Sequence, residues 1–240
     1  MKLAHRTWTE VPHRPLVLLP VGSTEQHGPH LPIATDTIIA VAVADAVVAG
    51  SDSQGALAGA LVAPAIAFGA SGEHQDFPGT ASAGTEAFGA YLLEVVRSLS
   101  TWAGRIVVVN GHGGNVPALA SVVPRLIDEQ HRVAWAPCGA PGSDAHAGRT
   151  ETSLMLHLDA SSVRGESFFA GNTSPISELM PELRKSGVRA VSPTGILGDP
   201  NGATADEGAA ILGQIVESVR RRILHNTPDA RGCLSDPGAT

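Results

Sequence analysis

Two stretches decide the fold: LVLLPVGSTEQHGPHLPIATDT, residues 16–37, and RIVVVNGHGGN, residues 105–115. Each begins with a run of apolar, largely β-branched residues, which is typical of a strand buried in a parallel sheet. Each run ends in a loop of glycine and polar residues. Open α/β sheets bind ligands at the carboxyl ends of their strands, so both loops are candidates for a ligand site.

The rest of the chain alternates between strand and helix patterns. Strands are expected at 16–21, 61–67, 105–110 and 132–137, and helices at 37–49, 85–103, 117–130, from about 150, and near the C-terminus around Ile211–Val219. This alternation predicts parallel βαβ units, and hence a single three-layer α/β/α domain over residues 1–225 with a mostly parallel sheet.

Several local features of this pattern are also expected. Thr85 can cap the helix that it begins, and Gly104 can end it. Pro124 should kink or restart the helix in which it lies. Residues 226–240 are polar and rich in turn formers, so they are expected to form a flexible tail.

Composition excludes several classes of protein. The net charge is −7, basic residues are scattered and aromatic residues make up 4% of the chain, which argues against nucleic-acid binding. The longest apolar run, residues 38–49, is shorter than the roughly 20 residues that a membrane-spanning helix needs. Two cysteines and a start without a signal-peptide pattern indicate a cytoplasmic protein.

Four side chains in the two opening stretches are of types that bind divalent metals. In an extended loop Glu25 and His27 point the same way, whereas Gln26 points away. Asp36 directly precedes an apolar helix, so it could cap that helix or bridge two metals. His112 ends an unusually apolar strand, where a histidine has little structural purpose unless it binds something.

A third stretch, DAHAGRTETSLML at 144–156, adds candidates for catalysis. His146 lies in a loop between strand and helix and suits a general acid or base. Glu151 could stabilise the start of a helix, bind metal or orient His146. Arg149 is the basic residue nearest to them in sequence, so it is either a solvated arginine or a contact for a substrate carboxylate.

Further residues could line a substrate pocket. Ser71, Glu73 and His74 lie together in GASGEHQDFPGT, residues 69–80. Gly113 belongs to a loop that matches neither common phosphate-binding pattern. Its lack of a side chain would instead let a substrate or metal approach the backbone closely.

Together these motifs resemble the creatininase family of metal-dependent amidohydrolases. The resemblance spans about residues 15–220, and the motifs follow the family's order: Glu25-x-His27-Gly, Asp36, Asn110-Gly-His112-Gly-Gly-Asn115 and His146-Ala-Gly-x-x-Glu151-Thr-Ser. The family implies a ring-like homo-oligomer, often a hexamer, and two divalent ions per subunit held by Glu25, His27, Asp36 and His112.

One departure concerns the metal ligands. Creatinine-cleaving members have a glutamate ligand where this chain has Gly114. The resemblance therefore leaves the second ion short of a ligand unless Glu151 supplies it, and it argues against creatinine as the substrate. Histidine and carboxylate together suit zinc, iron(II) or manganese. Such ions activate water and polarise the scissile carbonyl, and His146 would pass a proton to the departing amine.

The substrate is indicated by a narrower resemblance. Residues 63–80 and 190–208 look like a peptidase branch of the family that trims a modified precursor peptide during synthesis of a redox cofactor. This implies removal of a C-terminal Val-Tyr dipeptide. Hydrolysis of a small cyclic amide or a formamide is the alternative enzyme activity, and a metal-binding or assembly protein without turnover is the alternative from another class.

Overall fold

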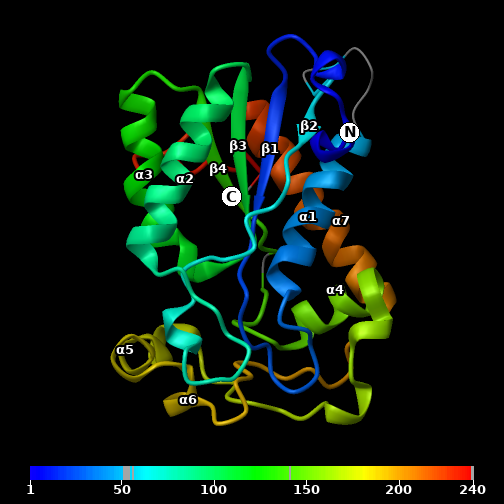
Figure 1. The fold of residues 1–240 in the computed structure, drawn as a ribbon. Helices are drawn as coiled ribbons and strands as arrows, with labels where there is room; N and C mark the ends of the chain where they lie inside the picture. The colour runs from blue at the N-terminus through cyan, green and yellow to red at the C-terminus, as the bar shows by residue number, and fades with distance from the viewer. Residues whose placement is uncertain (51–54, 56, 141, 239–240) are drawn as a thin grey trace.

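A sheet of four parallel strands forms the centre of the computed structural model, which describes residues 1–50, 55, 57–140 and 142–238 (Figure 1). The strand order is β2-β1-β3-β4, and the bounds are β1 Leu16–Val21, β2 Leu61–Val62, β3 Arg105–Asn110 and β4 Val133–Pro137. Strand β2 is shorter than the expected 61–67. Pro64 has no N–H to donate, and the chain pairs with β1 again only at Ile66.

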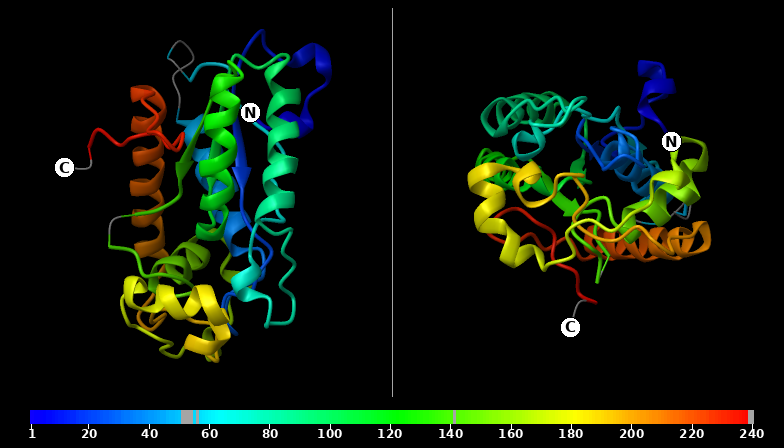
Figure 2. Two further views of the ribbon diagram at one scale, coloured as in Figure 1. Left: turned by 90° about the vertical axis from the view of Figure 1, so that its left-hand side faces the viewer. Right: turned by 90° about the horizontal axis from the view of Figure 1, so that it is seen from below.

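Helices cover both faces of the sheet. On one face lie α1 (Thr35–Ala49), α4 (Arg149–Asp159) and α7 (Ala205–His225); on the other lie α2 (Thr85–Ser100) and α3 (Val116–Asp128). Figure 2 shows α7 and the α2–α3 pair on opposite sides. Alternate strand residues face the two layers: Leu18 packs towards α1 and α7, and Val17 and Leu19 pack towards α2 and α3. The expected three-layer domain is confirmed.

The strand order reverses between β1 and β3. The β1–α1–β2 unit extends the sheet in one direction, whereas β3 and β4 extend it in the other. Chains leaving β1 and β3 therefore separate towards opposite faces and open a crevice at the carboxyl ends of these strands. Beyond those ends lie α5 (Ile176–Ser186) and the short α6 (Val188–Val191) (Figure 1).

Several local expectations differ from the structure. Thr85 is the first residue of α2, and the capping position belongs to Gly84, whose φ of 76° favours glycine. Helix α2 ends at Ser100, before the expected Gly104. Pro124 lies inside α3, which continues to Asp128 without restarting, because Val123 and Leu126 on either side remain packed in the core. Among the described residues, no helix is both long and apolar enough to cross a membrane.

The C-terminal segment 226–238 packs against the domain, although its composition predicted a flexible tail. The Leu234 side chain is fully buried, and its backbone N–H donates to the Trp135 carbonyl at 2.8 Å. Asp236 forms an ion pair with Arg221 at 3.1 Å. Leu234, the backbone hydrogen bonds to Trp135 and the ion pair of Asp236 together hold this segment on the domain. Residues 239 and 240 lie outside the described part of the chain.

We predict that Leu234→Ala lowers the free energy of unfolding by about 2–4 kcal/mol, because it removes a fully buried leucine and leaves a cavity. The matched control is Leu224→Ala, because Leu224 lies at the end of α7 with 56% of its surface exposed. Urea unfolding of both variants measures the difference. Equal, small losses would show that the segment does not belong to the folded core.

Candidate active site

The crevice between β1 and β3 gathers the four metal-binding candidates from separate segments. Glu25 and His27 lie in the loop after β1, Asp36 lies in the first turn of α1, and His112 follows β3. All four side chains are buried. Acidic and imidazole groups so far from solvent need partners, because an isolated buried charge is costly.

Asp36 lies between the two histidines. Its Oδ1 is 3.1 Å from His27 Nε2, and its Oδ2 is 3.1 Å from His112 Nδ1. Oδ2 also accepts a hydrogen bond from Ser23 Oγ at 2.7 Å. The alternative role of Asp36 as a helix cap is not seen, because Ala34 occupies the capping position of α1 and no side chain caps it. Asp36 thus has one oxygen available to each of two neighbouring positions.

The remaining ring nitrogens of these histidines are committed to backbone carbonyls. His27 Nδ1–H donates to the Glu25 carbonyl at 3.1 Å, which leaves Nε2 facing Asp36. His112 Nε2–H donates to the Ala70 carbonyl at 3.1 Å, which leaves Nδ1 facing Asp36. Metal-binding histidines characteristically hydrogen-bond in this way through the nitrogen that does not face the ion.

The Glu25 carboxylate is the least satisfied group in the described part of the structure. Both of its oxygens are buried there without a hydrogen bond of ordinary geometry, and the nearby Ser71 hydroxyl offsets part of the effect of burial on the pKa of Glu25. Three imidazole nitrogens surround them: His112 Nε2 at 3.2 Å, His74 Nε2 at 3.3 Å and His146 Nδ1 at 3.7 Å. Burial raises the pKa of Glu25 to about 7. A cation in the crevice would satisfy this carboxylate.

Three groups of side chains could each hold one ion, with ligand atoms within 4.8 Å of one another: Glu25–His27–Asp36, Glu25–His74–His146 and His27–His146–Glu151. Ligands about 2.0–2.1 Å from a tetrahedral ion lie roughly 3.3 Å apart, which is close to the separations around Asp36 and Glu25. The donor set therefore fits divalent metal.

The two histidines beside Asp36 have strongly altered acidity. Burial alone would lower the pKa of His27, but the charge of Asp36 and its hydrogen bond outweigh burial and raise this pKa to about 10. Burial is likewise outweighed at His112, where Glu25 and Asp36 raise the pKa to about 10. In the absence of metal, both imidazoles are protonated near neutral pH and balance the carboxylates.

Glu151 joins the cluster from the first turn of α4. Its Oε2 accepts a hydrogen bond from the Ala147 N–H at 2.6 Å and lies 3.9 Å from His27 Nε2. Burial raises its pKa to about 7. This position is compatible with a metal ligand next to His27, and it also ties the loop that carries His146 to α4.

His146 presents one nitrogen to the cluster and anchors the other. Its Nε2–H donates to the Gln26 carbonyl at 2.9 Å, and Nδ1 faces Glu25. Burial, helped by the charges of His27 and His74, holds the pKa of His146 well below its usual value. The imidazole is therefore neutral at neutral pH, with Nδ1 free to accept a proton or a ligand.

Gln26 connects the histidines, a role that the sequence did not indicate. Its Nε2 lies 2.9 Å from His74 Nδ1 and 3.1 Å from the Gly195 carbonyl, so it can donate to both. Its Oε1 accepts from the Gly28 N–H at 2.8 Å. The alternation of side chains correctly separates Gln26 from Glu25 and His27, but it cannot show that this side chain meets two further site elements.

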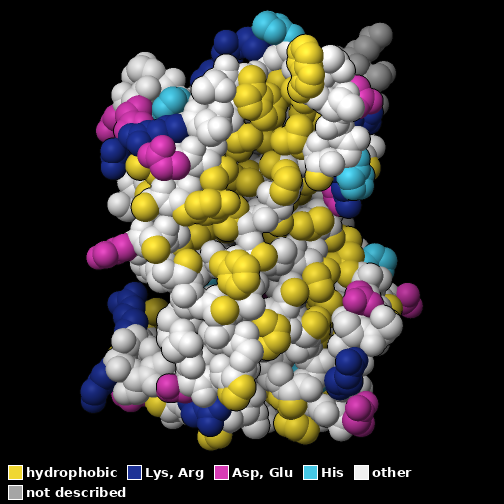
Figure 3. Space-filling model, viewed as in Figure 1, with side chains coloured by type: hydrophobic (Ala, Val, Ile, Leu, Met, Phe, Trp, Pro, Cys, Tyr) yellow, Lys and Arg dark blue, Asp and Glu magenta, His cyan; other side chains and the backbone are white. Residues whose placement is uncertain are grey.

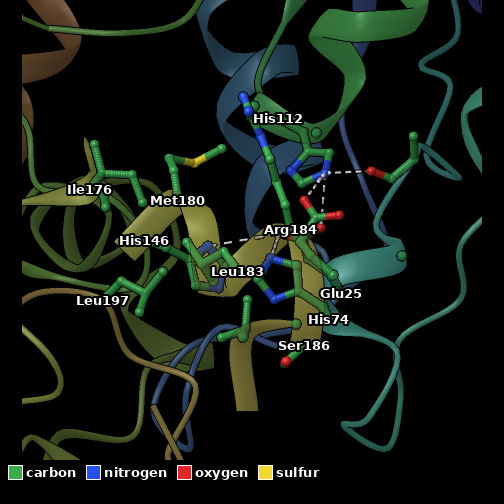
Figure 4. A pocket seen from close by; sticks show the side chains of 18 of the residues that line it. Glu25, His74, His112, His146, Ile176, Met180, Leu183, Arg184, Ser186 and Leu197 are labelled. Carbon is green, nitrogen blue, oxygen red and sulfur yellow. Dashed lines mark hydrogen bonds and ion pairs between the residues drawn. The ribbon is translucent and has the colours of Figure 1, made fainter. Parts of the chain in front are cut away.

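A cavity of about 810 Å³ opens onto this cluster (Figure 4). Glu25, His112 and His146 lie on it, and Glu73, His74 and Gly113 line it as well, as the sequence suggested. Helix α5 forms an apolar wall through Ile176, Met180 and Leu183, with the cations Arg184 and Lys185 at its end. The helices expected from the sequence did not include one at 176–186, so this wall was not foreseen.

Two of the proposed pocket residues do not line the cavity. Ser71 is buried beside the cavity, with Oγ 3.5 Å from His112 Nε2, but does not line it. Arg149 does not line the cavity either, and its guanidinium forms an ion pair with Glu207 at 2.9 Å. The position of Arg149 next to the His146 motif in sequence was therefore a poor guide to its surroundings.

Gly114 leaves no room for a side chain. A Cβ placed there would collide with the Ala70 carbonyl oxygen and with His112, and it would lie 2.6 Å from Glu73 Oε1. The Glu73 carboxylate, 3.7 Å from His112 Nε2, already occupies this space. A glutamate at position 114 would require the loop to move.

The chain is similar to known proteins over nearly its whole length. A family model described as creatininase, creatinine amidohydrolase, matches residues 4–223. Mycofactocin precursor peptide peptidase of Mycolicibacterium smegmatis is 54% identical over 92% of this chain and 89% of the relative. The protein of that name in Mycobacterium tuberculosis strain H37Rv is 50% identical over 98% of this chain and 95% of the relative.

Solved structures agree with the fold. A mutant creatininase superposes with a TM-score of 0.76 over 95% of this chain and 99% of its own, at 24% sequence identity. At that level of identity the likeness concerns the arrangement of the sheet and helices.

We predict that His27→Ala and His112→Ala each weaken metal binding at least roughly tenfold and reduce activity in parallel. Even loss of a residue that only orients a ligand costs 10–100-fold in affinity, and both imidazoles present one nitrogen to the Asp36 carboxylate. Metal content by mass spectrometry and hydrolysis measure both effects. His225→Ala, at the exposed end of α7, is the control. Full metal occupancy in His112→Ala would remove this histidine from the ligand set.

For His146→Ala we expect near wild-type metal content but turnover lowered by roughly 100-fold or more, which is the usual contribution of a general acid or base. The reason is that His146 Nδ1 is free for proton transfer while the other nitrogen is anchored. The same two measurements test this. Loss of metal together with activity would instead make His146 a ligand.

Proposed function

This chain belongs to the creatininase family, and from that premise we propose that it is a metal-dependent peptidase that removes the C-terminal Val-Tyr dipeptide from a modified mycofactocin precursor peptide. The observation that carries the proposal is the buried Glu25 carboxylate, which lacks hydrogen bonds of ordinary geometry at the base of an 810 Å³ cavity and is surrounded by imidazoles. The relatives at 50–54% identity, which bear this peptidase name, support the substrate.

Two divalent ions would be held around Asp36. Glu25, His27, Asp36 and His112 supply most of the ligands, and Glu151 lies where it can complete the set on the His27 side. Zinc, iron(II) and manganese all suit these donors. When bound, such ions lower the pKa of water and polarise the scissile carbonyl.

The protein's own groups carry the proton. Nδ1 of the neutral His146 can take a proton from the attacking water, because its other nitrogen is anchored on the Gln26 carbonyl. The same nitrogen can then donate this proton to the departing amine of the Val-Tyr product. The hydrogen bond from His146 Nε2–H to the Gln26 carbonyl fixes the orientation of this imidazole, and the Gln26 side chain holds His74 next to it.

Gly114 argues against creatinine as the substrate, because the creatinine-cleaving members that this chain resembles have a glutamate ligand at this position. The space beside His112 is filled by the Glu73 side chain, which extends from the cavity wall, and not by a side chain of the loop after β3. A volume of 810 Å³ lies within the range of pockets that enclose small to medium ligands, so it can accept the last residues of a peptide.

We also propose a cytoplasmic homo-oligomer, with a hexamer-like ring as the form implied by the family. Exposed apolar side chains support self-association: Trp8 is 86% exposed, and Phe68 and Tyr91 are each 58% exposed. Figure 3 shows hydrophobic side chains running along one face of the molecule. Large exposed apolar patches commonly mark protein–protein contacts.

Cleavage of a synthetic peptide tests the proposed activity. Metal-loaded protein should release the Val-Tyr dipeptide from a peptide that ends in Val-Tyr, and a chelator should abolish this release, because the ligand cluster needs its ions. A peptide with Val-Tyr at an internal position is the control, and mass spectrometry identifies the products. Turnover of creatinine or a formamide without any peptide cleavage would overturn the proposed substrate.

A further inference from the structure

We propose that Arg184 of α5 binds the free C-terminal carboxylate of the substrate, and that the apolar wall beside it receives the last side chains of the peptide. This inference rests on the proposed peptidase function and adds the group that recognises the substrate. A peptidase that removes a short C-terminal segment must distinguish a chain end from an internal bond. The terminal carboxylate is the feature that marks this end.

The geometry of α5 places Arg184 on the cavity side. Ile176, Met180 and Arg184 are spaced four residues apart, so they form one stripe along the helix, and all three line the cavity. The adjacent stripe, Leu179 and Leu183, packs with Val188 and Leu197 in a separate small core. The helix is thereby fixed, and Figure 4 shows the Arg184 side chain extending from it across the cavity.

The charge of Arg184 is available for a ligand. Within the described residues, its guanidinium forms no ion pair or hydrogen bond. Arg149, which the sequence suggested for carboxylate binding, is by contrast paired with Glu207, and Arg97 is paired with Glu129. A guanidinium matches a carboxylate with two parallel hydrogen bonds, which suits it to a chain end.

A simpler role for Arg184 is to stabilise the carboxyl end of α5, where basic residues are favoured by the helix dipole. Lys185 satisfies that role equally well. Lys185 also lines the cavity, but it lies about 100° further around the helix than Arg184, off the stripe of Ile176, Met180 and Arg184. Position on the apolar stripe therefore singles out Arg184 as the residue that can contact both the carboxylate and the neighbouring side chains of a bound peptide.

The wall also indicates the kind of residue that precedes the carboxylate. Ile176, Met180 and Leu197 present aliphatic and thioether groups to the cavity. Methionine adapts to irregular shapes and makes favourable contacts with aromatic rings. The site therefore fits a peptide that ends in large apolar or aromatic residues, of which Val-Tyr is one example.

The test combines the substitution Arg184→Gln with amidation of the substrate's C-terminus. Peptides that end in Val-Tyr with a free or an amidated C-terminus are given to the wild-type protein, to Arg184→Gln and to Arg132→Gln. Arg132 is an exposed arginine outside the cavity, so its variant controls for the loss of one positive charge. Metal content of each variant shows whether the catalytic cluster is intact.

In the wild-type protein and in Arg132→Gln, amidation should lower kcat/KM roughly tenfold, equivalent to about 1.4 kcal/mol of transition-state binding. In Arg184→Gln the ratio of the two efficiencies should fall towards one, mainly through a higher KM for the free acid. Unchanged discrimination in Arg184→Gln would overturn the proposal. So would loss of discrimination in Lys185→Gln with Arg184 intact.

Binding of the Val-Tyr dipeptide, measured by calorimetry, separates this proposal from the proposed function. Arg184→Gln should weaken binding of the free acid roughly tenfold, whether or not the peptide is cleaved. If the wild-type protein cleaves neither peptide but binds Val-Tyr through Arg184, the peptidase function fails and the carboxylate site stands. Equal affinity in wild type and Arg184→Gln would overturn the carboxylate site itself.

Discussion

The Asp36 carboxylate is buried between two imidazoles, and the surrounding structure is organised to make that arrangement stable. Asp36 and Glu25 cannot stay charged in the interior unless cations stand beside them. His27 and His112 meet this need, but they arrive on loops after different strands. Two glycines let those loops approach α1: a Cβ at Gly22 would lie 2.5 Å from the Thr37 backbone, and one at Gly111 would lie 2.6 Å from the Asp36 carbonyl oxygen. The buried charge pairs therefore depend on both the switch in strand order, which opens the crevice, and the glycines, which let the two loops approach α1.

The same charges make protons and metal ions compete for the nitrogens of His27 and His112. The carboxylates raise the pKa values of His27 and His112 to about 10, so both imidazoles carry protons near neutral pH while the site lacks metal. A metal ion needs the neutral imidazole, and its binding must displace these protons. The apparent metal affinity therefore rises as the pH rises, because protons compete less for the ring nitrogens. The contacts of both imidazoles with Asp36 keep the groups that would hold metal close together while the site lacks it.

The strands of the sheet and the loops that follow them could be predicted from sequence, because they depend on residues that are close together in the chain. The runs at 16–21 and 105–110 are so apolar that they form strands of a parallel sheet, and parallel strands bring the following loops to one edge. Glu25, His27, Asp36 and His112 meet there for that reason. Other features depend on partners far away in the chain. Helix α5 is held by a small core that includes Leu197, and Leu234 anchors the C-terminal segment through β4. The hydrogen bonds of Gln26 likewise reach His74 and the Gly195 carbonyl, which lie far away in the chain.

The residues that would act on a substrate and the residues that would recognise it belong to different parts of the fold. The residues that would hold metal and move protons lie on loops fixed by the central sheet and by α1, and most of them are buried. The wall that faces the substrate comes from α5, whose contacts are mainly with α6 and the segment around residues 72–74. Substitutions on the face of α5 that lines the cavity can therefore alter the fit of a substrate without disturbing the packing of Asp36 and its histidines. Glu73 couples the two parts, because it belongs to the 72–74 segment and reaches within 3.7 Å of His112 Nε2. Helix α5 therefore meets the charged cluster by two short routes: through the segment that carries Glu73, and through Leu197, whose backbone exchanges two hydrogen bonds with His146.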